Sequence, residues 1–263
     1  MNIEKIKSYW FAYIYNQQEN ETDDVNFLRS LIGTESQYIL EVACGAGRIL
    51  APLAEDGHRV VGFDCDEDML SFVGEKLVGC SAHYYLADAV SDPWGSGYDV
   101  VIEAANLLIN ILSDGEYEYA QKLFISKAAR ALRSGGKLYL DFNLFADPEK
   151  QYSCDTERVV FEGCDDRGVY GVYSILSTDY CPETQMLSSK TQTTLTLADG
   201  TVHRFEGTTV KHIPNLGQVH SWLNEAGFTV EKEFGDYQGN PISGNTSRCV
   251  IVAVKDLSYA GRY

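Results

Sequence analysis

The stretch Ile39–Arg48, ILEVACGAGR, decides the fold of this chain. An apolar run that ends at Val42 and contains the acidic Glu41 is followed by a Cys-Gly-Ala-Gly turn, which is typical of a strand that feeds a tight glycine loop and then a helix. Gly45 and Gly47 lack a Cβ, so they can take positive φ angles and let a ligand approach the main chain. The stretch therefore predicts a nucleotide-like ligand at the end of a strand.

Length and charge limit the classes of protein that fit. The chain has 263 residues, 44% of them apolar and 22% charged, which predicts one α/β core with an insertion. Acidic residues outnumber basic ones 38 to 21, and the formal net charge is −17. Nucleic acids are bound largely through Lys and Arg, so this charge argues against a nucleic-acid partner. The simpler interpretation of the charge is that it provides solubility.

Cysteine usage and hydropathy indicate the compartment. Seven scattered cysteines without a C-x-x-C pair do not resemble a disulfide framework or a zinc site. The amino-terminal MNIEKIKSYW has no apolar core of a signal peptide, and no apolar stretch approaches the length of a membrane span. We expect a cytoplasmic protein that does not contact a membrane.

From residue 37 onward, apolar strands alternate with helical patterns. The predicted strands are Tyr38–Val42, Arg59–Phe63, Ala82–Leu86, Asp99–Ala104 and Lys137–Phe142. The predicted helices between them are Arg48–Asp56, Glu67–Lys76 with Asp66 as its cap, and Tyr117–Leu132. This alternation predicts right-handed crossovers and a parallel sheet that is covered on both faces.

The pattern changes after Phe142. Four segments rich in Thr, Val and Tyr follow, separated by short turns: Val159–Glu162, Val169–Thr178, Met186–Leu197 and Thr201–Lys211. Short turns join antiparallel strands, so we expect an antiparallel β insertion. The parallel pattern then resumes with a helix at Leu216–Ala226 and strands at Phe228–Phe234 and Cys249–Lys255.

Residues 3–32 read as two helices, the second capped near Thr22 and ended by Gly33. The first carries a dense group of aromatic residues. Two interpretations remain open, since these side chains either pack on the core or cover part of a ligand pocket.

A glycine loop followed by an acid at the end of the second strand, here Asp64, occurs in two large classes of ligand site. A dinucleotide site needs a small residue three positions after the second glycine, so that helix and strand pack closely. That position is Leu50, which argues against a dinucleotide.

Five segments in order resemble the motifs of class I S-adenosylmethionine-dependent methyltransferases. They are EVACGAGR at 41–48, VGFD at 61–64 with Met69-Leu70, LADA at 86–89, YDVV at 98–101 and LRSGGKL at 132–138. The resemblance implies a Rossmann-like, doubly wound, mostly parallel seven-stranded sheet. It also implies S-adenosyl-L-methionine as cofactor and S-adenosyl-L-homocysteine as product.

The resemblance also implies roles for the residues of the cofactor site. The backbone from Ala43 to Gly47, including Gly45, would hold the methionine part and the ribose. Asp64 would accept hydrogen bonds from the two ribose hydroxyls, because each carboxylate oxygen can take one proton. Cys65 and Met69 would lie along the adenine ring, although Met69 also fits simple core packing.

The remaining cofactor contacts implied by the resemblance lie farther along the chain. Asp88 would accept from the adenine amine and the Ala89 backbone would add a contact, while a plain turn aspartate is the alternative for Asp88. Glu103, at the end of the fourth strand, lies where the family binds the methionine ammonium. Glu41 would orient the loop or bind that ammonium through water.

Within the class, the chain is most similar to small-molecule methyltransferases with an antiparallel β insertion after strand five, such as sugar-amine N-methyltransferases. This likeness implies a cofactor domain at 1–145 and 213–263 with a helical lid at its start, and a substrate-side roof at 146–212. It points to Tyr15 and His212 as catalytic residues and to Asn110 as a substrate-binding residue. The segment Lys211–Pro214 departs from the family's Arg-x-Tyr pattern, which leaves the substrate open.

The sequence thus predicts methyl transfer to nitrogen or oxygen of a small molecule. An amine needs positioning, whereas an alcohol needs a base, for which His212, His203 and Glu103 are candidates. No metal is expected, because Asp141 and Asn143 lack a third ligand nearby. An RNA or protein methyltransferase and a non-catalytic cofactor-binding regulator are the alternatives, and we expect a monomer or homodimer.

Overall fold

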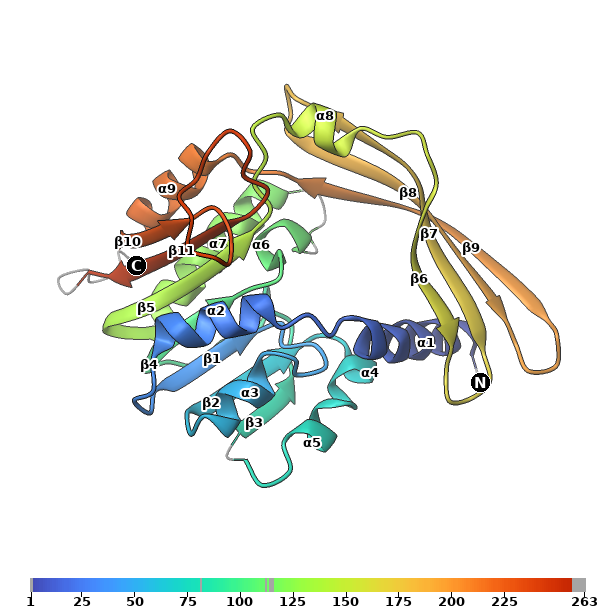
Figure 1. The fold of residues 1–263 in the computed structure, drawn as a ribbon, viewed down its shortest axis with the longest axis horizontal. Helices are drawn as coiled ribbons and strands as arrows, with labels where there is room; N and C mark the ends of the chain where they lie inside the picture. The colour runs from blue at the N-terminus through green and yellow to red at the C-terminus, as the bar shows by residue number, and fades with distance from the viewer. Residues whose placement is uncertain (1, 81, 112, 114–115, 257–263) are drawn as a thin grey trace. The chain divides into compact units, whose positions relative to one another are not determined.

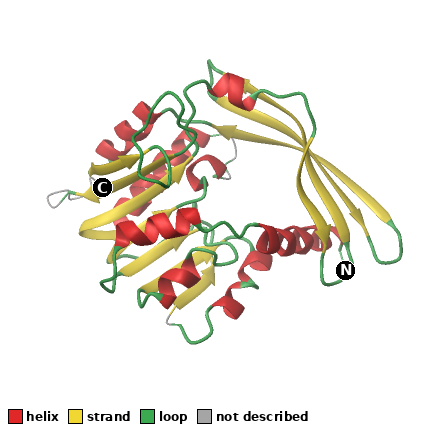
Figure 2. Cartoon of the chain, in the orientation of Figure 1, coloured by secondary structure: helices red, strands yellow, loops and turns green. Residues whose placement is uncertain are grey.

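The computed structural model describes residues 2–80, 82–111, 113 and 116–256 (Figures 1 and 2). Contacts within the chain divide it into two compact units. The smaller unit combines Met1–Asn20 with Asp147–Ile213, and the larger combines Glu21–Ala146 with Pro214–Tyr263.

The larger unit contains the predicted seven-stranded sheet, in the order β10-β11-β5-β4-β1-β2-β3. Its strands are β1 (Tyr38–Val42), β2 (Arg59–Asp64), β3 (Ala82–Leu86), β4 (Tyr98–Glu103), β5 (Leu132–Phe142), β10 (Phe228–Phe234) and β11 (Cys249–Lys255). Strands β1 to β5 pair in parallel, whereas β11 pairs antiparallel with β5 and with β10. The prediction of a doubly wound, mostly parallel Rossmann-like sheet is confirmed.

Helices cover both faces of this sheet, with α2 on one face and α7 on the other (Figure 1). They are α2 (Asp23–Ile32), α3 (Leu50–Glu55), α4 (Glu67–Leu70), α5 (Val73–Lys76), α6 (Leu107–Asn110), α7 (Tyr117–Ala131) and α9 (Leu216–Glu225). Val25 and Leu28 of α2 pack with Leu50 and Leu53 of α3 in one buried core cluster. Removing these side chains from water is the main force that holds helices and sheet together.

Two details of this unit differ from the sequence-based expectation. The predicted helix Glu67–Lys76 is interrupted at Ser71 and Phe72, so that it forms α4 and α5. The short helix α6 was not predicted, because its four residues carry no periodic pattern. The prediction that Asp66 caps the helix after β2 is confirmed, since its side chain accepts from Asp68 N and Met69 N.

The smaller unit contains the predicted antiparallel sheet, in the order β6-β7-β8-β9. Its strands are β6 (Arg158–Cys164), β7 (Tyr170–Cys181), β8 (Met186–Thr196) and β9 (Val202–His212), and its helices are α1 (Ile3–Gln18) and α8 (Pro148–Tyr152). The insertion expected between strand five and the last helix is therefore present as a separate sheet.

Helix α1 packs on this second sheet through Trp10 and Ile14, which lie one helical turn apart. Trp10 is fully buried and its Nε1 donates to Gly163 O at 3.0 Å. Gly171 makes this packing feasible, because a Cβ there would lie 2.2 Å from the Trp10 ring. The structure thus groups the first helix with residues 147–213, and a function of this segment as a lid stays a prediction.

Candidate functional site

The glycine loop follows β1 and takes a left-handed backbone at three positions. Ala43, Gly45 and Gly47 have φ angles of 55°, 53° and 79°. A Cβ added at Gly45 would meet nothing within 4 Å, so the loop borders open space there. A ligand can therefore lie directly against this backbone, as the sequence predicts.

Asp64 ties the glycine loop to the end of β2. Its Oδ2 accepts from Gly45 N at 2.8 Å and its Oδ1 accepts from Asp66 N at 2.9 Å. The residue is 9% exposed. Each carboxylate oxygen has a second lone pair, so Asp64 can still accept a hydrogen bond from each hydroxyl of a vicinal diol.

A cavity of about 150 Å³ opens beside this carboxylate. It is lined by Ala43, Phe63, Asp64, Cys65, Ala87, Asp88, Ala89, Val90, Leu107, Asn110, Ile111 and Phe124. The lining is mostly apolar with a few polar groups, which suits a flat heteroaromatic ring. Six of the residues predicted from the sequence meet here, namely Ala43, Asp64, Cys65, Asp88, Ala89 and Asn110.

Asp88 also organises the loop that follows β3. Its Oδ1 accepts from Val90 N and Ser91 N, each at 2.8 Å. These hydrogen bonds hold the pKa of Asp88 below its usual range, so the side chain is ionised at neutral pH. Oδ2 takes no part in these bonds, and it is the atom that the predicted contact with the adenine amine would use.

Glu41 and Glu103 lie outside the cavity lining and are buried, at 4% and 0% exposure. Burial raises the pKa of each carboxyl group to about 8. Within the described residues, neither oxygen of Glu103 and only one oxygen of Glu41 has a hydrogen-bond partner. Arg48 opposes the shift at Glu41 and forms a bidentate pair with Asp24, at 2.7 Å on both arms.

These features fit S-adenosylmethionine. The open backbone at Gly45 accommodates a close ligand, Asp64 has acceptor capacity for a ribose, and the buried acids suit a cationic ammonium and sulfonium. Gly47 and Met69 do not line the cavity; Gly47 packs against Val73, and Met69 lies in α4. Their predicted contacts with the cofactor stay predictions.

Arg248 was not predicted from the sequence as a residue of the site. This residue precedes β11 and lies 3.4 Å from Asp141, a fully buried acid of β5. Tyr237 donates to the same acid at 2.9 Å. The available signal was a lone arginine directly before the apolar run CVIVAV, but only the fold shows what it meets.

The predicted catalytic residues belong to the smaller unit. Tyr15 is half-buried on α1, with its ring centroid 5.9 Å from that of Phe161. His212 is 5% exposed and ends β9, where it pairs with Met186 of β8. His203 lies in the same strand. The catalytic roles of Tyr15 and His212 stay predictions.

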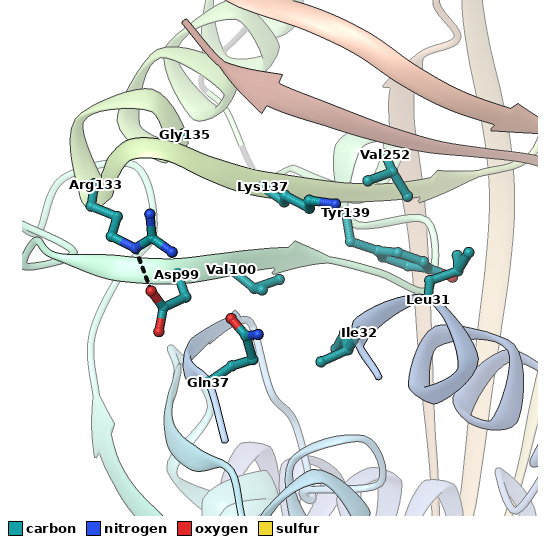
Figure 3. A pocket seen from close by; sticks show the side chains of 10 residues that line it. All are labelled: Leu31, Ile32, Gln37, Asp99, Val100, Arg133, Gly135, Lys137, Tyr139 and Val252. Carbon is teal, nitrogen blue, oxygen red and sulfur yellow. Dashed lines mark hydrogen bonds and ion pairs between the residues drawn. The ribbon is translucent and has the colours of Figure 1, made fainter. Parts of the chain in front are cut away.

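A second cavity, of about 170 Å³, lies toward the amino ends of the strands (Figure 3). It is lined by Leu31, Ile32, Gln37, Asp99, Val100, Arg133, Gly135, Lys137, Tyr139 and Val252. Its cationic side chains are already engaged, since Arg133 pairs with Asp99 and Lys137 with Glu231. In open α/β sheets ligands bind beyond the carboxyl ends of the strands, so the smaller cavity is the better functional candidate.

Two features are absent from the described part of the chain. None of its helices combines the length and apolar character that a membrane crossing requires. Its His, Cys, Asp and Glu side chains form no group of three or more that could hold a metal ion.

The chain is similar to a known protein family over residues 39–136 and to an individual relative over most of its length. Residues 39–136 match a family model described as a methyltransferase domain. A relative from Geobacillus sp. (strain WCH70), described as a methyltransferase, is 24% identical over 258 residues, which cover 93% of this chain and 98% of the relative.

Two solved structures show the same fold. A S-adenosylmethionine-dependent methyltransferase from Clostridium acetobutylicum is 14% identical, with a TM-score of 0.72 and coverage of 94% of this chain and 98% of that one. The sugar N-methyltransferase KedS8 from Streptoalloteichus is 20% identical, with a TM-score of 0.69 and coverage of 92% and 91%.

Proposed function

We propose that this chain is a class I S-adenosylmethionine-dependent methyltransferase. We further propose that it transfers the methyl group to a nitrogen or oxygen atom of a small molecule. The cofactor would supply a methyl group bound to a sulfonium sulfur. The methyl carbon is the electrophile, and the thioether S-adenosylhomocysteine is the leaving group. The protein then has to bind the acceptor, align it and exclude water.

The observation that carries the cofactor part of the proposal is the arrangement around Asp64. Its carboxylate holds the glycine loop through Gly45 N while keeping acceptor capacity beside an apolar cavity. Asp64 would bind the ribose, the loop backbone would border the methionine part, and Asp88 would orient the adenine. Glu41 and Glu103 have pKa values of about 8 and are mainly protonated at neutral pH in the free chain; they would ionise beside the cationic end of the cofactor, because a nearby cation lowers the pKa of a carboxyl group.

Two observations support a small acceptor. The net charge of −17 opposes binding of a polyanionic RNA. The fold extends over most of KedS8, a sugar N-methyltransferase, so amino sugars are the first acceptor class to test. We place this activity in the cytoplasm and in a monomer or homodimer.

We further propose that the acceptor is handled by Asn110, Tyr15 and His212. Asn110 borders the cofactor cavity and would bind the acceptor. An amine acceptor needs only alignment, whereas an alcohol or phenol needs proton removal, for which His212 would serve. Residues 1–20 would form a lid, and the sheet within 146–212 would form the substrate-side roof.

The direct test is product formation with the purified chain and S-adenosylmethionine. Amino sugars, simple amines, sugars, phenols, a peptide pool and transfer RNA are supplied separately, and S-adenosylhomocysteine release is measured together with the acceptor's mass. We expect release only with a small amine or hydroxyl compound, whose mass increases by one CH₂. Release with the RNA or peptide pool alone would reject a small-molecule acceptor. Asp64→Ala serves as the control that loses turnover with every acceptor.

A further inference from the structure

The turn after β4 has a strained backbone without glycine. Ala105 and Asn106 are consecutive residues with φ angles of 54° and 66°. The left-handed region is unfavourable for residues with a Cβ, and such strain persists only where surrounding contacts impose it. The turn must therefore be held by specific partners.

Four hydrogen bonds hold this turn, three with residues at the end of β5 and one with Arg248, which precedes β11. Asn106 N donates to Asp141 O at 3.1 Å, and Ala105 N donates to Asp141 Oδ2 at 3.3 Å. On the other side, Asn106 Oδ1 accepts from Asn143 N at 2.6 Å and from Arg248 Nη1 at 3.0 Å. Asp141 and Asn106 are thus the two points through which the turn is fixed.

Arg248 joins these two points. Its Nη1 reaches both Asn106 Oδ1 and Asp141 Oδ1, the latter at 3.4 Å. Asp141 is fully buried and also accepts from the hydroxyl of Tyr237, above which the Arg248 guanidinium lies at 5.4 Å from the ring centroid. Burial raises the pKa of Asp141 and the Arg248 guanidinium opposes this shift, so Arg248 favours the ionised carboxylate.

The strained turn leads directly into one wall of the cofactor cavity. Helix α6 starts at Leu107, and Leu107, Asn110 and Ile111 all line that cavity. Arg248 itself is absent from the lining. Its hydrogen bond to Asn106 therefore reaches the cavity wall through the turn.

We infer that Arg248 is a positioning residue, which bridges Asn106 and Asp141 to hold the left-handed turn and so places the α6 wall of the cofactor cavity. This role goes beyond the proposed acceptor chemistry, because it concerns binding of the cofactor and is independent of the acceptor's identity. Arg248 makes no contact with the cofactor in this role.

The test measures S-adenosylhomocysteine affinity by calorimetry and thermal stability of the full chain. Arg248→Met removes the charge and the donor but keeps the length of the side chain. Asn106→Ala removes the acceptor that Arg248 uses and keeps a Cβ at the left-handed position. The double variant completes a thermodynamic cycle, and Arg248→Lys is the conservative rescue. Arg133→Met is the matched control, since it breaks an ion pair near the other end of the strands.

We expect Arg248→Met and Asn106→Ala each to weaken binding about tenfold, which corresponds to about 1.4 kcal/mol. The double variant binds no more weakly than either single variant, Arg248→Lys recovers part of the affinity, and Arg133→Met binds like the wild type. Lower thermal stability with unchanged affinity in Arg248→Met would reduce Arg248 to a structural residue and overturn the inference.

The combined variant gives a second way to refute the inference. Losses that multiply in the double variant would show that Arg248 acts independently of Asn106. Should Arg248→Met fail to fold, Asn106→Ala decides alone, and undiminished affinity there rejects the role. A wild type that binds S-adenosylhomocysteine but methylates no small molecule would refute the proposed acceptor class and leave this inference standing.

Discussion

Two turns follow the carboxyl ends of strands in the large sheet, one after β1 and one after β4. Both contain residues with a left-handed backbone, but different residue types and different contacts hold them. The loop after β1 has two glycines, Gly45 and Gly47, among its three left-handed residues, the third being Ala43, and it is held by Asp64, which lies 19 residues from Gly45. The turn after β4 uses Ala105 and Asn106, and the donor that bridges it lies 142 residues from Asn106. The first turn is built from local residue preferences, whereas the second depends on contacts that exist only in the folded chain.

The largest expected effect comes from removing the support of the first turn. Asp64→Ala leaves Gly45 N and Asp66 N without their acceptor and removes the predicted partner of the ribose. We expect affinity for S-adenosylhomocysteine to fall about a hundredfold in calorimetry. Asp66→Ala is the control, because it removes only a helix cap and should lower thermal stability while leaving affinity near that of the wild type. Wild-type affinity in Asp64→Ala would remove this loop from the cofactor site.

The second effect concerns Glu103, the buried acid at the end of β4. Burial raises the pKa of Glu103 from 4.5 to about 8, so the folded chain holds this proton more tightly than the unfolded chain. The resulting stability is present below pH 4.5 and is lost as the pH rises toward 8.

Glu103→Gln removes this titration. We expect its free energy of unfolding to fall less steeply than that of the wild type between pH 5 and 8, by up to about 1.4 kcal/mol per pH unit. Denaturant titrations at several pH values measure the difference. Parallel curves for the two proteins would show that Glu103 does not titrate in this window.

A smaller effect tests the glycine turn directly. Gly45→Ala places a Cβ at a φ of 53°, although nothing lies within 4 Å of that Cβ. The cost is therefore backbone strain without a steric clash, and we expect the free energy of unfolding to fall by about 1 to 2 kcal/mol. Urea denaturation provides the measurement. An unchanged midpoint would mean that the loop does not need glycine at this position.

The smallest effect has the opposite sign and lies in the second turn. Ala105→Gly relieves the strain at a φ of 54° but adds freedom to the unfolded chain, so we expect a gain of about 0.5 kcal/mol in unfolding free energy. Few side-chain contacts are lost, because the methyl group that is removed belongs to an exposed residue. A loss of stability in thermal denaturation would show that the backbone at Ala105 is not strained.

Much of the cofactor side could be predicted from local patterns. Strands β1, β3, β10 and β11 have the predicted bounds, because short apolar runs between turn residues define buried strands well. Asp66 acts as the predicted cap because capping depends on neighbours within one turn. The division of residues 67–76 into two helices could not be predicted, since packing on the sheet decides it.

The acceptor side was far less accessible from the sequence. The support of the turn after β4 was equally hard to predict, because Asn106, Tyr237 and Arg248 belong to three separate segments and no local pattern indicates that they meet. The roles of Tyr15, Asn110 and His212 rest on a family resemblance and stay predictions. Side chains that act together across long separations leave no periodic signal.

The sequence by itself determined the parallel sheet, the separate antiparallel sheet and the glycine loop of ILEVACGAGR, because burial periodicity and the φ range of glycine are local properties. Only the tertiary structure decided which contacts hold the turn after β4 and which acidic side chains are buried. Burial and long-range pairing depend on what the rest of the chain places around a residue, and so Glu103 and Arg248 acquire their properties only in the folded protein.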